Sequence, residues 1–231
     1  PVRFPVLAIQ PPAAPAARDA VMTAWGGYHL AIFISPTAVD EALAWFDAHP
    51  AAPRPPAGPR LAAVGAKTAA ALTALGWPLA LHPTTRYDSE GLLALPELQD
   101  VQGQHIVLCK GEGGRPLLCE ALSERGATVY VADLYRRGRP VADVTALMAS
   151  WQHQGLDAIM LTSVEALHNL CDLLGSAGRE LLRQTPLILG SQRMSEAALA
   201  AGLMPGATAR DPSDAAMVEA LLAWRQGVDI R

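Results

Sequence analysis

The sequence predicts an α/β protein made of two similar domains, each with a parallel β-sheet covered by helices. Short apolar segments alternate along the chain with longer helical patterns, which is typical of parallel sheets with helices on both faces. One strand-turn-helix pattern also occurs twice, about half a chain apart, first around Ser35 and again around Ser163. The length of 231 residues, 51% of them hydrophobic, is enough for one or two globular domains.

The two copies of this pattern align residue by residue. Residues 32–39 and 63–72 form the first copy, and residues 160–167 and 189–198 form the second. The alignment places Ser35 on Ser163, Gly65 on Ser191, Lys67 on Arg193 and Gly76 on Gly202. In each copy an apolar strand runs into a small or hydroxyl-bearing turn that opens a helix, so backbone N–H groups point out of the helix start. Two such domains facing each other indicate a clamp for one anionic ligand.

Proline and glycine set the limits of the elements in the first half of the chain. Five prolines between residues 49 and 59 restrict that segment to a loop, because proline has a fixed φ and no N–H group. Gly76 is placed to end a helix. The expected elements are strands at residues 2–9, 30–34 and 61–64, and helices at 37–48, 67–75 and 89–95.

The second half of the chain continues the alternation. Pro116 stands where the first turn of a helix accepts proline, and Asp211, Pro212 and Ser213 form a helix start signal. The expected elements are strands at 105–109, 128–135, 158–161 and 187–189, and helices at 116–126, 141–154, 195–201 and 213–225.

The duplication predicts where the domains begin and end. Domain 1 is expected to combine residues 1–10 with 141–231, and domain 2 to comprise residues 11–140. Connectors near 5–11 and 134–140 would lie side by side and form a hinge. A complete repeat in domain 1 would need a further strand, loop and helix before Pro1, roughly 25 residues on the expectation that each copy is a full unit.

Composition excludes several classes of protein. The net charge of −4 argues against a general nucleic-acid binder. No apolar run approaches the roughly 20 residues of a membrane span. The three cysteines, Cys109, Cys119 and Cys171, form no CxxC pair, which favours reduced thiols over a metal site. We therefore expect a cytoplasmic protein with no metal, no membrane contact and no nucleic-acid partner.

Several motifs, in this order and spacing, resemble the bacterial type of uroporphyrinogen-III synthase. They are Phe-Ile-Ser-Pro-Thr-Ala-Val at 33–39, Ala-Val-Gly-Ala-Lys-Thr-Ala at 63–69, Lys-Gly-Glu-Gly-Gly-Arg at 110–115, Leu-Tyr-Arg-Arg at 134–137 and Thr-Ser-Val-Glu-Ala-Leu at 162–167, with weaker matches at 5–9 and 89–93. The chain departs from the family pattern at Thr37, where many members have Asn, and at Lys110, where many have Arg. The opening strand of the family is missing.

The resemblance implies a fold and an activity. The fold would be two flavodoxin-like parallel-sheet domains joined by a two-stranded connector. The activity would be cyclisation of the linear tetrapyrrole hydroxymethylbilane to uroporphyrinogen III, with loss of water and inversion of ring D, in haem biosynthesis. The family needs no metal or organic cofactor, and a monomer is expected. A transient contact with hydroxymethylbilane synthase is a further partner hypothesis.

Turns between strands and helices are the expected binding groups, because the substrate carries many carboxylates. Backbone N–H groups and hydroxyls at helix starts bind anions, and cations beside them add charge. The expected substrate-binding residues are Ser35, Thr37, Gly65, Lys67, Ser89, Lys110, Gly111, Gly113, Ser163, Ser191 and Arg193. Each of them taken alone is equally an ordinary cap, tight turn or solvated charge.

Two residues are expected to take part in the reaction. Tyr135 matches the connector tyrosine of the family, and a phenol is protonated at neutral pH and can donate a proton. Thr68 matches a threonine that faces the substrate. The alternatives are a connector tyrosine that packs against the domains and a threonine that caps a helix.

Two functions of another class remain open on sequence. One is a non-catalytic tetrapyrrole- or anion-binding sensory module that has kept the fold. The other is a periplasmic-type anion-binding protein. The alternation of the chain between the two domains favours the synthase over the second of these.

Overall fold

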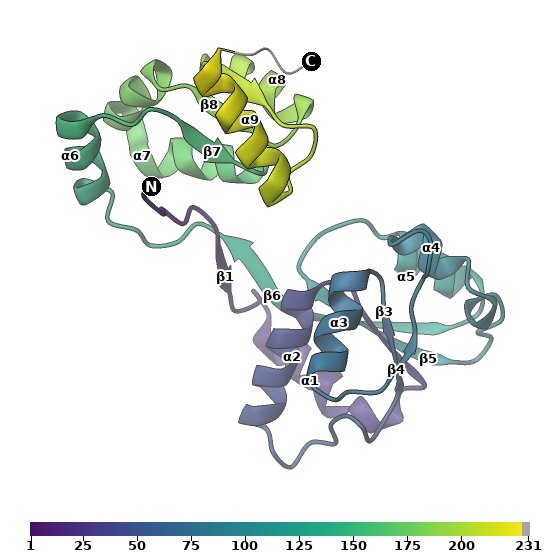
Figure 1. The fold of residues 1–231 in the computed structure, drawn as a ribbon. Helices are drawn as coiled ribbons and strands as arrows, with labels where there is room; N and C mark the ends of the chain where they lie inside the picture. The colour runs from purple at the N-terminus through teal and green to yellow at the C-terminus, as the bar shows by residue number, and fades with distance from the viewer. Residues whose placement is uncertain (228–231) are drawn as a thin grey trace. The chain divides into compact units, whose positions relative to one another are not determined.

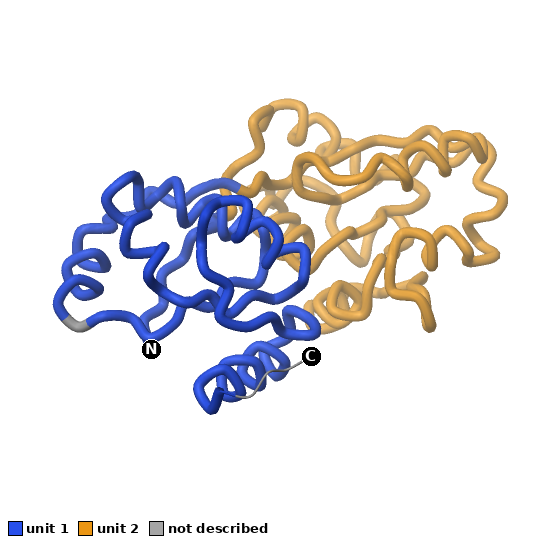
Figure 2. Tube along the Cα trace, turned by 90° about the horizontal axis from the view of Figure 1, so that it is seen from above, with its two compact units in different colours: residues 1–8, 138–231 blue, residues 9–137 orange. Residues whose placement is uncertain are grey.

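The computed structural model describes residues 1–227, and the chain divides into two compact units (Figures 1 and 2). Unit 1 comprises Pro1–Ala8 and Gly138–Arg231, and unit 2 comprises Ile9–Arg137. The last residues of the expected domain 1, 228–231, lie outside the described part. The fold is α/β with mainly parallel sheets, as the alternating pattern predicts.

Unit 2 contains a six-stranded sheet in the order β1-β6-β5-β2-β3-β4. The five strands from β6 to β4 pair in parallel. The strands are β1 (Ala8–Gln10), β2 (Leu30–Phe33), β3 (Arg60–Ala63), β4 (Leu79–Leu81), β5 (His105–Gly111) and β6 (Thr128–Gly138).

Both faces of the central strands β2, β3 and β5 are buried. In β2, Ala31 and Phe33 belong to one apolar cluster, whereas Leu30 and Ile32 belong to a second cluster on the opposite face. This alternation follows from the two-residue period of a strand, and it requires helices on both sides. The helices that contribute to the cluster around Ala31 and Phe33 are α1 (Pro15–Thr23), α2 (Pro36–Ala48) and α3 (Ala66–Ala74). Those that contribute to the cluster around Leu30 and Ile32 are α4 (Ser89–Leu93) and α5 (Leu117–Glu124). Short 3-10 helices, η1 (Trp25–Gly27) and η2 (Pro96–Leu98), complete the unit.

Unit 1 contains a three-stranded parallel sheet in the order β7-β8-β9. The strands are β7 (Ile159–Leu161), β8 (Leu187–Leu189) and β9 (Pro205–Thr208), and the helices are α6 (Thr145–Gln154), α7 (Val164–Gln184), α8 (Gln192–Ala200) and α9 (Asp214–Gln226). Within residues 1–227, no helix has both the length and the apolar character needed to cross a membrane.

The internal repeat is visible in the helix starts of the two units. Ser35 precedes α2 and its hydroxyl accepts the N–H of Ala38 at 3.1 Å, while Ser163 precedes α7 and accepts the N–H of Ala166 at 3.0 Å. Gly65 and Ser191 are the equivalent residues before α3 and α8. The same local sequence pattern thus forms the β2-α2-β3-α3 segment and the β7-α7-β8-α8 segment.

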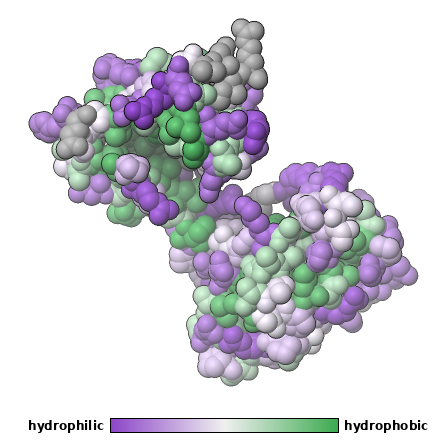
Figure 3. Space-filling view, in the orientation of Figure 1, coloured by the Kyte–Doolittle hydropathy of each residue, from purple (hydrophilic) through white to green (hydrophobic). Residues whose placement is uncertain are grey.

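The first strands of the two repeated segments, β2 and β7, differ in the strands they pair with. β2 pairs with both β3 and β5, whereas β7 pairs, among the described residues, with β8 alone. A cavity of about 510 Å³ lies along β7, and its lining includes Val6, Trp151 and Leu170. The face of unit 1 seen in Figure 3 has a hollow with a hydrophobic wall, and hydrophilic residues surround it.

The chain passes between the units twice, at two neighbouring strands. The first passage is at Ala8 and Ile9 in β1, and the second is at Arg137 and Gly138 in β6. β1 and β6 are adjacent in the sheet of unit 2.

Two expected elements are wrong in extent. The strand expected at 2–9 is reduced to Ala8–Gln10, since Pro5 has no N–H group to offer a neighbouring strand. The helix expected at 141–154 begins only at Thr145, because the Asp143 carboxylate accepts the N–H of Thr145 at 2.8 Å and forms a turn there.

Three further elements were not expected from the sequence: α1, β4 and β9. α1 follows directly on a proline-rich stretch that reads as a loop, although Pro15 occupies its first turn, where proline fits a helix. β9 consists of Pro-Gly-Ala-Thr, residues that usually form turns, and its strand geometry depends on pairing with β8.

Arg125 holds the end of α4 and η2 to α5. Its guanidinium Nη1 donates to the carbonyl oxygens of Leu93 at 2.9 Å and Leu98 at 2.8 Å. We expect Arg125→Ala to lower the free energy of unfolding by about 2 kcal/mol, because two carbonyls lose a charged donor. Chemical denaturation measures this, with Arg60→Ala, an exposed arginine at the start of β3, as the matched control. Equal stability of the two variants would contradict the assigned role.

Candidate functional site

A cavity of about 600 Å³ opens in unit 2 where β2, β5 and β6 end. Parallel sheets present their sites at the carboxyl ends of the strands, and this cavity lies at that edge. Six residues expected from the sequence to bind or react line it: Ser35, Ser89, Lys110, Gly111, Gly113 and Tyr135.

Tyr135 forms the floor of the cavity together with Gly111 and Ser35. Its side chain is 3% exposed, and its hydroxyl lies 3.1 Å from the Ser35 Oγ. A Cβ added to Gly111 would lie 2.6 Å from Cζ of Tyr135, so the ring packs directly against the glycine. Ser35 also accepts the N–H of Ala38, which fixes its Oγ. The tyrosine hydroxyl is therefore held in one position by a glycine and a helix cap.

A shift in strand pairing brings Tyr135 to this position. Lys110 pairs with Asp133, but the next residue, Gly111, pairs with Tyr135, so β6 contains one extra residue at that point. Such bulges turn side chains away from the regular alternation. The bulge explains how Tyr135 reaches Gly111 rather than the opposite face of the sheet.

The glycine loop at residues 111–116 is held in place by side chains at both of its ends. Lys110 Nζ donates to the Gly113 carbonyl at 2.5 Å and lies 3.3 Å from Asp133 Oδ1. The Glu112 carboxylate accepts the N–H of Ala13. Gly113 and Gly114 have φ of 76° and 85°, values that other residues rarely adopt. Lys110, expected to bind substrate, is thus also a structural support of the loop.

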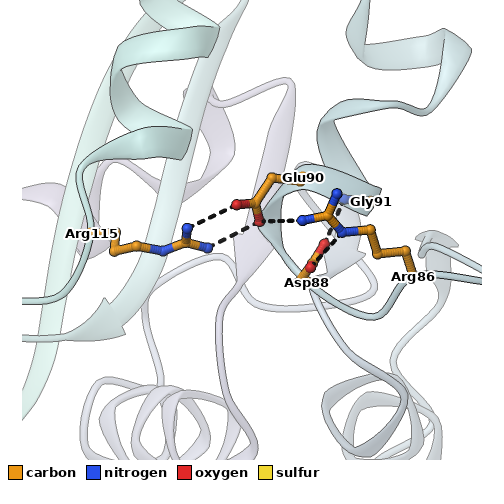
Figure 4. Close-up of polar contacts among 5 residues, drawn as sticks. All are labelled: Arg86, Asp88, Glu90, Gly91 and Arg115. Atoms are coloured by element: carbon orange, nitrogen blue, oxygen red, sulfur yellow. Dashed lines mark hydrogen bonds and ion pairs between the residues drawn. The ribbon is translucent and has the colours of Figure 1, made fainter.

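A network of two arginines and two carboxylates ties the glycine loop to the start of α4 (Figure 4). Arg115 donates to both oxygens of Glu90, at 2.8 and 3.0 Å. Arg86 lies 3.6 Å from the same carboxylate and donates from Nε to Asp88 at 2.6 Å. Asp88 in turn accepts the N–H of Gly91 and caps the helix.

Hydrogen bonds in this network lower the pKa of both carboxyl groups. The Arg115 guanidinium lowers the pKa of Glu90 to about 2. The Gly91 N–H, followed by Arg86, lowers the pKa of Asp88. A carboxylate whose pKa falls on folding stabilises the fold above its ordinary pKa, and this contribution is lost as the pH falls towards 2. Both groups are ionised at neutral pH.

The cavity is more positive than negative. Lys110, Arg115 and Arg137 line it with only one carboxylate, that of Glu112. On sequence, Arg115 flanks the glycine loop and is either an anion-binding group or a solvated charge, whereas nothing in the motif around Arg137 assigns it to the cavity. Cys119 also lines the cavity.

The remaining expected residues lie elsewhere. Thr37, Gly65, Lys67 and Thr68 are in unit 2 at the starts of α2 and α3 but do not line the cavity; Lys67 is exposed and Thr68 is 3% exposed. Ser163, Ser191 and Arg193 belong to unit 1, at the starts of α7 and α8. Arg193 and Lys67 occupy equivalent positions in the first turns of α8 and α3, as the repeat predicts.

Metal ligands do not gather anywhere in residues 1–227, where no group of three or more His, Cys, Asp or Glu side chains could hold an ion. Burial raises the pKa of the Cys109 thiol, which disfavours the reactive thiolate. The groups that the cavity does offer are hydroxyls, backbone amides and cations. They can bind a carboxylate-rich ligand and donate a proton to it.

The close contact between Gly111 and Tyr135 can be tested by adding one methyl group. We expect Gly111→Ala to lower the free energy of unfolding by about 1–3 kcal/mol, because the tyrosine ring must move. Thermal unfolding checks this, with Gly27→Ala as the control, since a Cβ at Gly27 meets nothing within 4 Å. The cost should disappear in a Tyr135→Ala background. If the losses of unfolding free energy in the two single variants simply added in the double variant, the tyrosine ring would not be what the added methyl group meets.

The Glu90 pair can be tested by removing its charge. Glu90→Gln should speed amide hydrogen exchange in residues 111–115 by about two- to fivefold, because an exposed ion pair stabilises a loop only weakly. Glu97→Gln, on η2, is the control. Unchanged exchange would mean that the pair of Arg115 and Glu90 does not stabilise the loop and that its contacts through Lys110 and Glu112 are sufficient.

Sequence comparison identifies relatives over most of the chain. A family model described as Uroporphyrinogen-III synthase HemD matches residues 1–219. The uroporphyrinogen-III synthase of Salmonella typhimurium is 34% identical over 168 residues, which are 72% of this chain and 68% of that protein. The Escherichia coli protein of the same name is 32% identical over 69% of this chain and 65% of its own length. The chain thus spans about two thirds of the length of these relatives.

Solved structures agree in fold. A mutant uroporphyrinogen III synthase from Thermus thermophilus superposes with a TM-score of 0.59 at 24% identity, covering 98% of this chain and 90% of its own. The uroporphyrinogen-III synthetase of Helicobacter pylori gives 0.60 at 15% identity, covering 85% and 83%. The resemblance expected from the motifs is confirmed, and the chain belongs to the uroporphyrinogen-III synthase family.

Proposed function

We propose that this chain converts hydroxymethylbilane to uroporphyrinogen III, with loss of water and inversion of ring D, in tetrapyrrole biosynthesis. Family membership over residues 1–219 supports the reaction. The observation that carries the mechanism is the fixed hydroxyl of Tyr135, which lies in a cavity that also contains Lys110, Arg115 and Arg137.

The cations and amides of the cavity suit the carboxylate side chains of this substrate. Arg115 and Arg137 are exposed at the cavity rim, where a guanidinium can bind a carboxylate through two parallel hydrogen bonds. Arg115 already binds Glu90 in this way, so a substrate carboxylate would replace or join that partner. Ser89 and the amides of the glycine loop would contribute neutral donors.

The reaction begins when the hydroxyl on the ring-A hydroxymethyl group leaves. The pyrrole nitrogen supplies the electron pair, and a proton donated to the hydroxyl lets it depart as water. We assign this donor to Tyr135. The Ser35 oxygen accepts a hydrogen bond from the Ala38 N–H. When the Ser35 hydroxyl donates its own hydrogen to the phenol oxygen of Tyr135, the hydrogen of the phenol remains available for the substrate. The same bond from Ser35 stabilises the phenolate that forms.

Ring inversion depends on where the rings are held. After water leaves, ring D attacks through its substituted carbon, and the resulting spiro intermediate breaks and closes again with ring D reversed. Spontaneous closure through the unsubstituted carbon gives the type I isomer. The role of the cavity is therefore mainly positioning, since the substrate is reactive by itself.

The proposal extends to the rest of the expected site and to the whole molecule. Thr37, Gly65, Lys67, Thr68, Ser163, Ser191 and Arg193 are proposed to contact the substrate in addition to the cavity residues. We further propose that the molecule has two flavodoxin-like domains and that the two-stranded connector at β1 and β6 serves as a hinge. It would act as a monomer in the cytoplasm and make a transient contact with hydroxymethylbilane synthase. The passages of the chain at Ala8 and Arg137, on adjacent strands, support the connector.

Product analysis distinguishes the synthase from a module that only binds tetrapyrroles. Fresh hydroxymethylbilane is supplied to the protein, the products are oxidised, and the type I and type III porphyrins are separated. We expect predominantly type III. Type I alone, formed at the uncatalysed rate, would leave the binding module as the function.

Removing one hydroxyl tests the proton donor. We expect Tyr135→Phe to fold like the parent and to lower kcat by about tenfold to a hundredfold, because the ring packing stays and the donor is lost. Tyr130→Phe is the matched control, since Tyr130 lies on the same strand but outside the cavity lining. Full turnover to type III product by the Tyr135 variant would remove it as the donor.

A further inference from the structure

A second polar cavity lies in unit 1, on one face of α7. It has a volume of about 570 Å³, and its lining includes Arg139, Cys171, Asp172, Gly175, Arg179 and Arg183. An adjoining cavity of about 360 Å³ shares four of these residues. Arg179 and Arg183 are four positions apart in the part of α7 after Gly175, so they lie on one side of that part. This site is separate from the cavity of unit 2, which no residue of α7 lines.

A break in α7 shapes this cavity. Gly175 has φ 61° and ψ −162°, which interrupts the helix between Val164 and Gln184. A second helical segment therefore begins at Ser176, which also lines the cavity. The first N–H groups of a helical segment have no partner within the helix, and they attract negative charge.

The lining contains three arginines and one carboxylate, and two of the arginines contact that carboxylate. Asp172 Oδ2 lies 3.1 Å from Arg139 Nη1, and Asp172 Oδ1 lies 3.5 Å from Arg179 Nη2. Arg179 also donates from Nε to the Cys171 carbonyl at 3.4 Å. Arg183 pairs with Glu180 at 3.1 Å, and Glu180 does not line the cavity. The lining of the cavity thus carries three positive charges and one negative charge.

The arginines are both positioned and accessible. The side chains of Arg139, Arg179 and Arg183 are 53%, 51% and 54% exposed. Asp172 holds two of the guanidinium groups near each other, although like charges would otherwise separate them. An exposed pair of this kind adds little stability by itself, so the surplus of charge is not explained by folding.

We propose that this arginine cavity binds an oxyanion, a carboxylate or phosphate group of a small molecule. Guanidinium groups match the planar carboxylate and the phosphate face through paired hydrogen bonds. The start of the second segment of α7 adds amide donors. Asp172 occupies part of the site when no ligand is bound and yields its arginines to the ligand. The proposal does not depend on the synthase reaction.

Binding titrations of the full chain test the proposal. Inorganic phosphate and tricarballylate serve as probes in isothermal titration calorimetry, with sodium chloride keeping the ionic strength constant. We expect saturable binding of at least one probe, and the tighter of the two identifies the chemistry of the ligand. The variant Arg179→Ala/Arg183→Ala should bind at least tenfold more weakly, since charged hydrogen bonds are lost.

Two further variants make the test independent of whether the double variant folds. Asp172→Asn should bind the probe several-fold more tightly, because a competing carboxylate is removed. Arg225→Ala, an exposed arginine in the last turn of α9, should bind like the parent. The proposal would be overturned if Asp172→Asn bound the probe more weakly than the parent or if all variants bound it equally. It would also be overturned if the heat measured in the titration changed with ionic strength alone.

Discussion

The central strands of the unit 2 sheet, β2, β3 and β5, are buried on both faces, and the place of the cavity in that unit depends on this constraint. Strands covered on both sides by helices can hold only apolar side chains along their length. Polar chemistry is therefore confined to the ends of the strands. β2 ends next to Ser35, and β5 ends at Lys110 and Gly111, so hydroxyl, cation and glycine loop meet at one edge. The cavity is a direct result of how the core is packed.

Local pattern was enough to predict most of the fold and part of the cavity. Ser35, Gly111 and Gly113 follow apolar strands, and a residue in that position of a parallel sheet is carried to the carboxyl edge. The cap made by Ser35 and the helix starts at Gly65 and Ser191 also follow from adjacent residues. The short strands β4 and β9 did not follow; in β9 the residues Pro-Gly-Ala-Thr favour a turn, and the strand geometry depends on pairing with β8.

The features that could not be predicted are those that join distant segments. The bulge that places Tyr135 on Gly111 depends on the pairing of β5 with β6, and one residue more or less in either strand would turn the ring away. The bidentate pair of Arg115 and Glu90 joins residues 25 positions apart. The arginine cavity depends on a break at Gly175 inside a continuous helical pattern. Each of them is decided by tertiary packing rather than by local sequence.

The two sides of β7 differ in a way that has a consequence for the sheet of unit 1. Among the described residues β7 pairs on one side only, with β8, and the cavity beside it is lined largely by apolar side chains. Met160 on this strand is 40% exposed. A further parallel strand that paired with the other side of β7 would cover this apolar surface, as β5 does for the equivalent strand β2 in unit 2.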